Sequence, residues 1–96
     1  MNREEILLQL RRFREQYHAQ YHIVKIGIFG SAARGEMTEN SDLDIVVDLS
    51  QPDFFALAGI QQSLEAQLHR PVDIVRYRQN MNQYLKRRID KEAVYV

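Results

Sequence analysis

The sequence contains no cysteine, no tryptophan and no long apolar run. Without cysteine, disulfide frameworks, thiolate zinc sites and cysteine nucleophiles are excluded, and the composition fits a reducing compartment, which predicts a cytoplasmic location. The N-terminal stretch MNREEILLQLRRFREQYHAQ is too highly charged for a signal peptide. No segment approaches the roughly 20 apolar residues of a membrane span, so we expect neither export nor membrane insertion.

Lysine and arginine are missing from the middle of the chain. Residues 35–69 carry seven acidic side chains and no Lys or Arg, whereas residues 70–91 carry seven Lys or Arg. Such a basic run is most often a solvated helix face, but it also suits ATP phosphates or an acidic protein partner. No basic surface interleaved with aromatic residues is present, so we favour a protein partner over direct nucleic-acid binding.

Hydrophobic spacing predicts one domain over residues 1–96 with an α/β (α+β) fold, in which helices cover mainly one side of a small mixed β-sheet. The first expected helix follows an N-cap at Asn2. The second runs from Pro52 and Asp53 to before Pro71, and the last covers Met81–Lys91. The expected strands are Ile23–Phe29, Leu43–Leu49 and the segment VDIV at residues 72–75, with a short turn or helix at Ala32–Met37. The final AVYV is an apolar tail that can pair or dock.

Carboxylates are conspicuous in the two later strands. Asp42 and Asp44 flank one residue, so they point to the same face about 7 Å apart, at about 3.3 Å per residue. Asp73 lies in the third strand, and it joins the pair if the second and third strands are neighbours. Like charges at this spacing are unfavourable unless a cation neutralises them, and oxygen ligands favour magnesium or manganese. The acids therefore predict a divalent-metal site.

A glycine turn precedes these acids. Gly30 ends the first strand and Ser31 begins the next turn, where free backbone N–H groups and a hydroxyl suit a phosphate. An EF-hand is excluded because Val47 stands where its turn glycine belongs, and a P-loop because no Gly-Lys-Ser/Thr follows. A metal-binding acid pair beside a phosphate cradle is typical of two-metal phosphoryl or nucleotidyl transfer.

The arrangement Gly30-Ser31, ten residues, then Asp42-x-Asp44 resembles the signature of the DNA polymerase beta-like nucleotidyltransferase superfamily. The longer stretch GSAARGEMTENSDLDIVV and the ending YLKRRIDKEAVYV are similar to its minimal nucleotidyltransferase (MNT) branch. The resemblance implies that Asp42 and Asp44 hold two magnesium ions, and that Asp73 completes the site and helps to activate the acceptor hydroxyl. It also implies that Gly30 and Ser31 bind nucleotide phosphates and that Arg34 supports the phosphates or the turn.

The same resemblance implies a function. MNT proteins act as antitoxins in type VII-like HEPN/MNT toxin–antitoxin modules and transfer AMP from ATP to a tyrosine of the HEPN toxin, so a hetero-oligomer with such a toxin is expected. The alternative is a non-catalytic antitoxin that neutralises its toxin by binding alone. An aminoglycoside-type nucleotidyltransferase ranks last, because this chain has no room for a second domain that holds the small-molecule acceptor.

Overall fold

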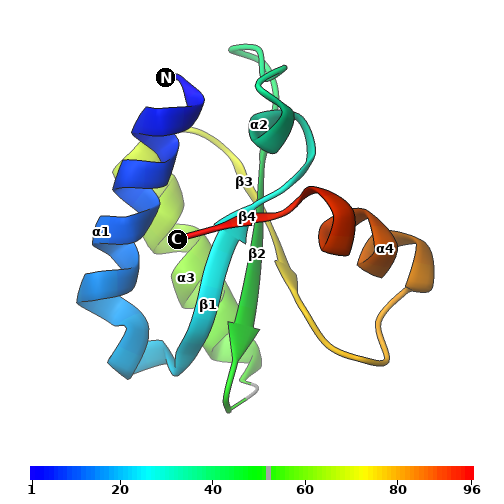
Figure 1. Ribbon diagram of the computed structural model, residues 1–96. Coiled ribbons are helices and arrows are strands. Elements are labelled where there is room, and N and C mark those ends of the chain that lie inside the picture. The colour runs from blue at the N-terminus through cyan, green and yellow to red at the C-terminus, as the bar shows by residue number, and fades with distance from the viewer. Residues whose placement is uncertain (52) are drawn as a thin grey trace.

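The computed structural model describes residues 1–51 and 53–96, so Pro52, expected at the start of a helix, lies outside the described residues. Helices and strands alternate along the chain (Figure 1). Their order is α1 (Arg3–Tyr21), β1 (Ile23–Ile28), α2 (Gly30–Arg34), β2 (Leu43–Leu49), α3 (Phe54–Leu68), β3 (Val72–Arg76), α4 (Gln83–Glu92) and β4 (Val94–Tyr95). Among the described helices, none is long and apolar enough to cross a membrane.

The four strands form one mixed sheet in the order β3-β2-β1-β4. β1 pairs antiparallel with both β2 and β4, and β2 pairs in parallel with β3. The second and third predicted strands are therefore neighbours. The apolar tail also pairs, because Val94 and Tyr95 lie opposite Ile28 and Gly27 of β1. The predicted small mixed sheet with helices is confirmed.

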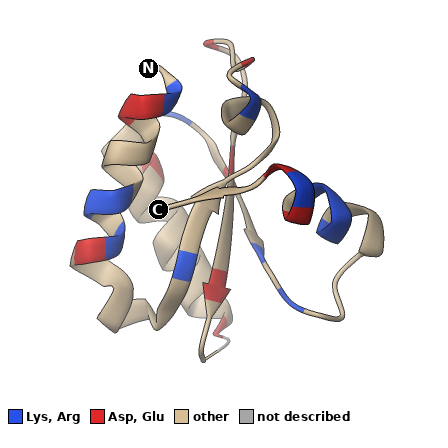
Figure 2. Cartoon of the chain, viewed as in Figure 1, with Lys and Arg blue, Asp and Glu red and all other residues tan. Residues whose placement is uncertain are grey.

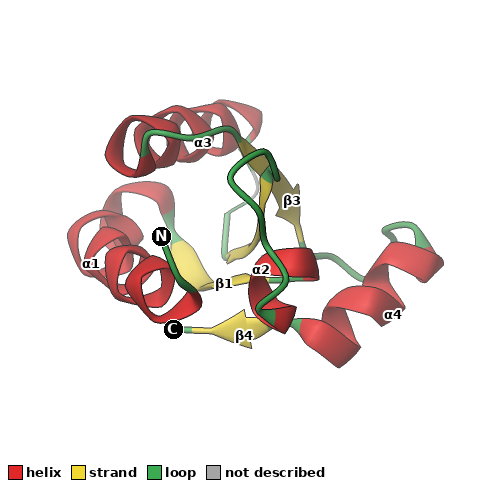
Figure 3. Cartoon of the chain, turned by 90° about the horizontal axis from the view of Figure 1, so that it is seen from above, coloured by secondary structure: helices red, strands yellow, loops and turns green. Residues whose placement is uncertain are grey.

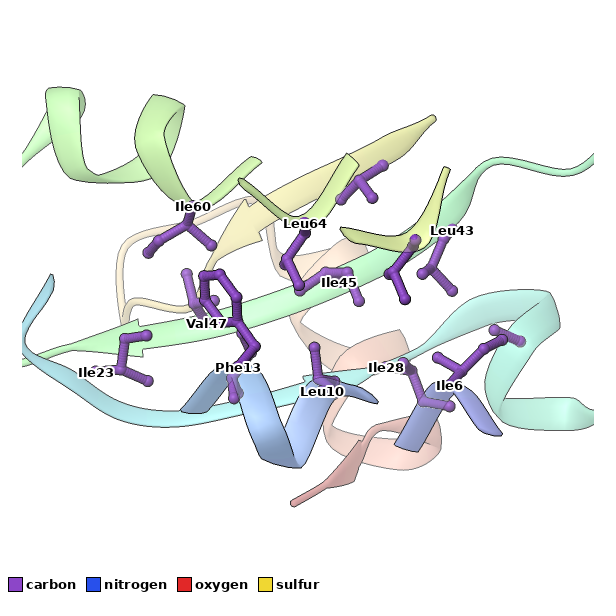
Figure 4. Close-up of a cluster of buried hydrophobic side chains, with 14 of the residues drawn as sticks. Ile6, Leu10, Phe13, Ile23, Ile28, Leu43, Ile45, Val47, Ile60 and Leu64 are labelled. Carbon is purple, nitrogen blue, oxygen red and sulfur yellow. The ribbon is translucent and has the colours of Figure 1, made fainter. Parts of the chain in front are cut away.

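The main core lies between one face of the sheet and the two long helices, α1 and α3 (Figure 3). Figure 4 shows side chains from both helices meeting those of β1 and β2 in this layer. The largest fully buried members are Ile6, Leu10, Phe13, Ile26, Ile28, Leu43, Ile45, Ile60 and Leu64. Burying each such side chain stabilises the fold by about 1.5–3 kcal/mol relative to exposure.

A smaller cluster covers the opposite face of the sheet. It consists of Phe29, Val46, Met81 and Ile89, with Leu85 of α4 packed against it. Strand residues alternate between faces, so the odd-numbered residues of β2 enter the main core while Asp44 shares the α4 face with Val46. Helices therefore cover mainly one side, as expected, while α4 packs on the other side.

The boundaries of several elements differ from the prediction. α4 begins at Gln83 rather than Met81, because the Asn82 side chain caps it by accepting from the Leu85 N–H, and Met81 enters the smaller cluster. α2 begins at Gly30 rather than Ala32. It stops before Gly35, whose left-handed backbone, at φ 72°, terminates the helix.

We expect Gly27→Ala to destabilise the protein, because the backbone of the paired strand β4 lies very close to this glycine. A Cβ there would overlap the Val94 carbonyl oxygen and approach the Tyr95 Cα within 2.9 Å. Displacing backbone atoms of a paired strand is energetically costly. We therefore expect a loss of about 1–3 kcal/mol in the free energy of unfolding measured with urea. Val24→Ala, at an exposed position of the same strand, is the control and should lose less. An unchanged midpoint for Gly27→Ala would contradict the close approach of β4.

Candidate functional site

The three predicted acids meet at one edge of the sheet, where β2 and β3 begin. Asp44 lies directly opposite Asp73 in the parallel register of these strands. Asp42 stands immediately before β2. Asp44 is half-buried, whereas Asp42 and Asp73 are exposed. The sequence left open whether these strands are neighbours. Their pairing brings Asp44 and Asp73 side by side, although they are 29 residues apart in the chain.

The surroundings of Asp44 disfavour its charged form. Burial raises the pKa of its carboxyl group, and the neighbouring charges of Asp73 and Asp42 raise it further. Arg88 of α4 and Arg34 of α2 oppose this effect, but the net shift remains upward. Figure 2 shows that basic residues gather along α4, beside the sheet. The carboxylates around Asp44 therefore outweigh the two arginines, and a bound cation would relieve this repulsion.

The turn between β1 and α2 lies against the same carboxylate. Gly30 has a left-handed backbone at φ 68°, and a Cβ at this position would overlap Oδ2 of Asp44. The Phe29 N–H donates to the Asp44 carbonyl oxygen at 3.1 Å, which fixes the turn to β2. Ser31, in the first turn of α2, is partly exposed beside this contact. The predicted Gly-Ser turn therefore lies against Asp44, one member of the predicted acid pair.

Arg34 and Glu92 connect this turn to α4. The Gly30 N–H donates to Oε2 of Glu92 at 3.1 Å, and Nη1 of Arg34 donates to both Glu92 oxygens at 3.1 Å. Arg34 also donates through Nε to Glu36 at 3.1 Å. Sequence reasoning missed Glu92. The sequence did hold one indication of this contact. Glu92 lies just before the apolar tail, and pairing of that tail with β1 brings Glu92 to the end of β1, where Gly30 lies.

The donor set fits magnesium held jointly with a nucleotide. Within residues 1–51 and 53–96, no three His, Asp or Glu side chains lie close enough to enclose one ion. Magnesium seldom needs such a cage, because it is usually held by one or two carboxylates, substrate phosphates and waters. Asp42 and Asp44 provide carboxylate oxygens, and the Gly30 backbone lies directly against the Asp44 carboxylate.

Comparisons with known proteins agree with this geometry. The family model described as "Nucleotidyltransferase domain" matches residues 8–96. Protein adenylyltransferase MntA of Thermococcus cleftensis is 33% identical over 94 residues, which are 97% of this chain and 94% of that protein. MJ1379 of Methanocaldococcus jannaschii is 35% identical over 95 residues, covering 96% and 95% of the two chains.

Solved structures extend the comparison to the fold. A structure assigned as a minimal nucleotidyltransferase is 33% identical, has a TM-score of 0.76, and covers 98% of this chain and 95% of its own. A toxin–antitoxin structure with AMP-PNP also has a TM-score of 0.76, covers 99% of this chain and 72% of that chain, and shares 22% identity, which supports the fold alone. The turn and the acids at one edge of the sheet agree with the family model and with the minimal relatives. This chain therefore belongs to the nucleotidyltransferase-domain family, in its minimal branch.

Proposed function

We propose that this protein is a magnesium-dependent protein adenylyltransferase that transfers AMP from ATP to a tyrosine of a HEPN-domain toxin and so acts as its antitoxin. The observation that carries the proposal is the contact of Gly30 with Asp44, which itself lies opposite Asp73. This contact places a turn suited to phosphates against carboxylates suited to a metal. Nucleotidyl transfer requires both at one point.

The relatives support the choice of AMP and of a protein acceptor. The Thermococcus cleftensis relative is named a protein adenylyltransferase. A structural neighbour with 20% identity and a TM-score of 0.58 is an MNT antitoxin in complex with a tri-AMPylated Shewanella oneidensis HEPN toxin. These names describe those proteins, and the matching geometry of this chain is our reason for extending the activity to it. ATP and a HEPN partner in a hetero-oligomer follow from the same proposal.

Each site residue then has a role. Asp42 and Asp44 would hold two magnesium ions, with Asp73 completing the site, and the metal would supply the positive charge that stabilises the transferring phosphate. Gly30 allows the backbone to approach the phosphates closely, and Ser31 and Arg34 donate hydrogen bonds to them. Asp73 accepts the proton of the tyrosine hydroxyl. The tyrosine oxygen bonds to the α-phosphorus as the bond to the pyrophosphate oxygen breaks, and pyrophosphate leaves.

A direct test combines the purified chain, ATP, magnesium and the HEPN-domain protein encoded beside it, recognised by an Arg-x4-His motif. Intact-mass spectrometry should show the HEPN protein gaining the mass of AMP, and peptide fragmentation should locate it on a tyrosine. Chelation with EDTA is the control and should stop the gain. Modification of a free small molecule such as an aminoglycoside, with none of the HEPN protein, would contradict the proposal.

Asp73→Asn separates catalysis from simple docking. Asn keeps the size of the side chain but accepts no proton, so AMP transfer should fall by about 10²–10⁴-fold, the range for general acid–base catalysis. Because Asp73 is exposed, the fold should remain intact. The variant should still bind the toxin in a pull-down and fail to protect cells from it. Protection equal to that of the parent would mean that neutralisation occurs by binding alone.

A further inference from the structure

Glu92 is the last residue of α4, yet its side chain contacts the glycine turn 62 residues earlier in the chain. One oxygen accepts the Gly30 N–H at 3.1 Å, and both oxygens accept Nη1 of Arg34 at 3.1 Å. The Glu92 side chain is 20% exposed to solvent, whereas that of Glu36, the other partner of Arg34, is 65% exposed. Glu92 is thus the more enclosed of the two carboxylates that hold Arg34.

The contact satisfies a backbone N–H that the helix itself cannot. Gly30 is the first residue of α2, so its N–H has no partner within the helix. Glu92 supplies that partner. Its second contact restrains Arg34 through Nη1, which leaves the two Nη2 hydrogens of the guanidinium available for a phosphate. The geometry is therefore one of support at the edge of the site rather than of obstruction.

The position of Glu92 is in turn fixed by the sheet. β4 begins two residues later, and Val94 lies opposite Ile28, so the end of α4 cannot shift without unpairing the tail. The Val96 N–H donates to the Ile26 carbonyl at 3.0 Å, and Arg14 of α1 donates to the Val96 carbonyl. A carboxylate held in this way has a fixed position relative to Gly30 and Arg34.

We infer that Glu92 is a positioning residue for nucleotide binding, acting through Gly30 and Arg34. This inference rests on the proposed function, because it assumes that those two residues meet the phosphates of ATP. Glu92 itself touches neither the phosphates nor the reacting atoms. Loss of its carboxylate leaves the Gly30 N–H without this partner and Arg34 with Glu36 as its remaining ion-pair partner, so the turn and the guanidinium are no longer held in place before ATP arrives.

The test measures ATP binding directly and then activity. Dissociation constants are measured with a fluorescent ATP analogue and magnesium for the parent, Glu92→Ala, Glu92→Gln and Glu36→Ala, at a temperature where circular dichroism shows every variant folded. Residues that orient a binding group typically contribute 10–100-fold, so Glu92→Ala should weaken binding by about tenfold or more. Glu92→Gln keeps an oxygen that can accept from Gly30 and should recover part of the loss. Glu36→Ala, the control, should change binding by less than about twofold, as expected for an exposed ion pair.

Two further readouts separate positioning from a purely structural role. The KM for ATP should rise in Glu92→Ala while kcat with saturating ATP changes much less, because the acids that perform the chemistry are intact. In an Arg34→Ala background, Glu92→Ala should have a smaller effect than in the parent, since Glu92 acts partly through Arg34. Additive effects in this cycle would overturn that route.

The outcomes also distinguish this inference from the proposed function. If the parent binds the ATP analogue and Glu92→Ala binds it equally well, the inference is wrong and the proposed function stands. Tighter binding by Glu92→Ala would overturn the inference too, because it would make Glu92 a competitor of the phosphate. If the parent fails to bind the analogue, the proposed function fails, and the inference fails with it.

Discussion

The double variant Asp42→Asn/Asp44→Asn is expected to lose AMP transfer while remaining folded. Both carboxylates are the proposed magnesium ligands, and asparagine keeps their shape but removes the negative charge that holds the metal. Transfer measured by mass gain of the HEPN protein should drop below detection at any magnesium concentration. Asp48→Asn is the matched control, because Asp48 lies on the same strand and the same face as Asp44 but opposite Lys25, away from the site. Transfer at the parental rate by the double variant would refute the metal assignment.

The same variant should be more stable than the parent at neutral pH in the absence of metal. The pKa of Asp44 is higher in the folded protein than in the unfolded chain, because burial and Asp73 disfavour its charged form. Folding therefore favours protonated Asp44, and the parent loses stability as the pH rises from below the ordinary aspartate pKa to above the raised folded value. Asparagine has no charge to gain over this range.

Urea denaturation at two pH values checks this sign. At pH 7 the double variant should unfold at a higher urea concentration than the parent, and the difference should shrink in acid, where Asp44 of the parent is protonated. Magnesium should raise the parent's midpoint at pH 7 if it binds the folded site, and should leave the variant unchanged. A variant that is less stable than the parent at pH 7 would show that the carboxylates stabilise the fold rather than strain it.

Much of the fold was predictable because local signals were strong. β2 was predicted with its exact bounds, since LDIVVDL is a nearly continuous apolar run bordered by polar loops. The N-cap at Asn2 was predicted from residue type, and its side chain accepts the Glu5 N–H. The convergence of Asp44 and Asp73 was expected only if their strands were neighbours, and the pairing of β2 with β3 meets that condition. Start points such as that of α4 were less predictable, because Met81 fits the helical spacing but is needed in the smaller core cluster.

The parts of the site that escaped prediction depend on contacts between distant segments. Nothing in the local sequence shows that Glu92 reaches Gly30, because that contact requires β4 to pair with β1. The close approach of Gly30 to Asp44 likewise depends on two strands and a turn. Sequence patterns specify which residues bear the chemistry, whereas the close approaches that orient them arise only when the sheet is assembled.

Gly30→Ala is expected to damage both stability and transfer, because two separate requirements for glycine meet at this position. The backbone is left-handed at φ 68°, which costs a residue with a Cβ about 1–2 kcal/mol. The added Cβ would also overlap Oδ2 of Asp44, so the carboxylate or the turn must shift. Together we expect a loss of about 2–4 kcal/mol in the free energy of unfolding.

Gly35→Ala provides the matched control for this prediction. Gly35 ends the same helix with nearly the same backbone angle, φ 72°, but no heavy atom of the described chain would lie within 4 Å of its Cβ. It should therefore lose only about 1–2 kcal/mol and retain its transfer activity. For Gly30→Ala, displacement of Asp44 by a few tenths of an ångström or more should reduce AMP transfer by about 100-fold, measured where both variants are fully folded. If both alanine variants keep parental transfer, the close contact between the turn and Asp44 is not part of the catalytic geometry. If both lose it equally, backbone strain rather than that contact is responsible.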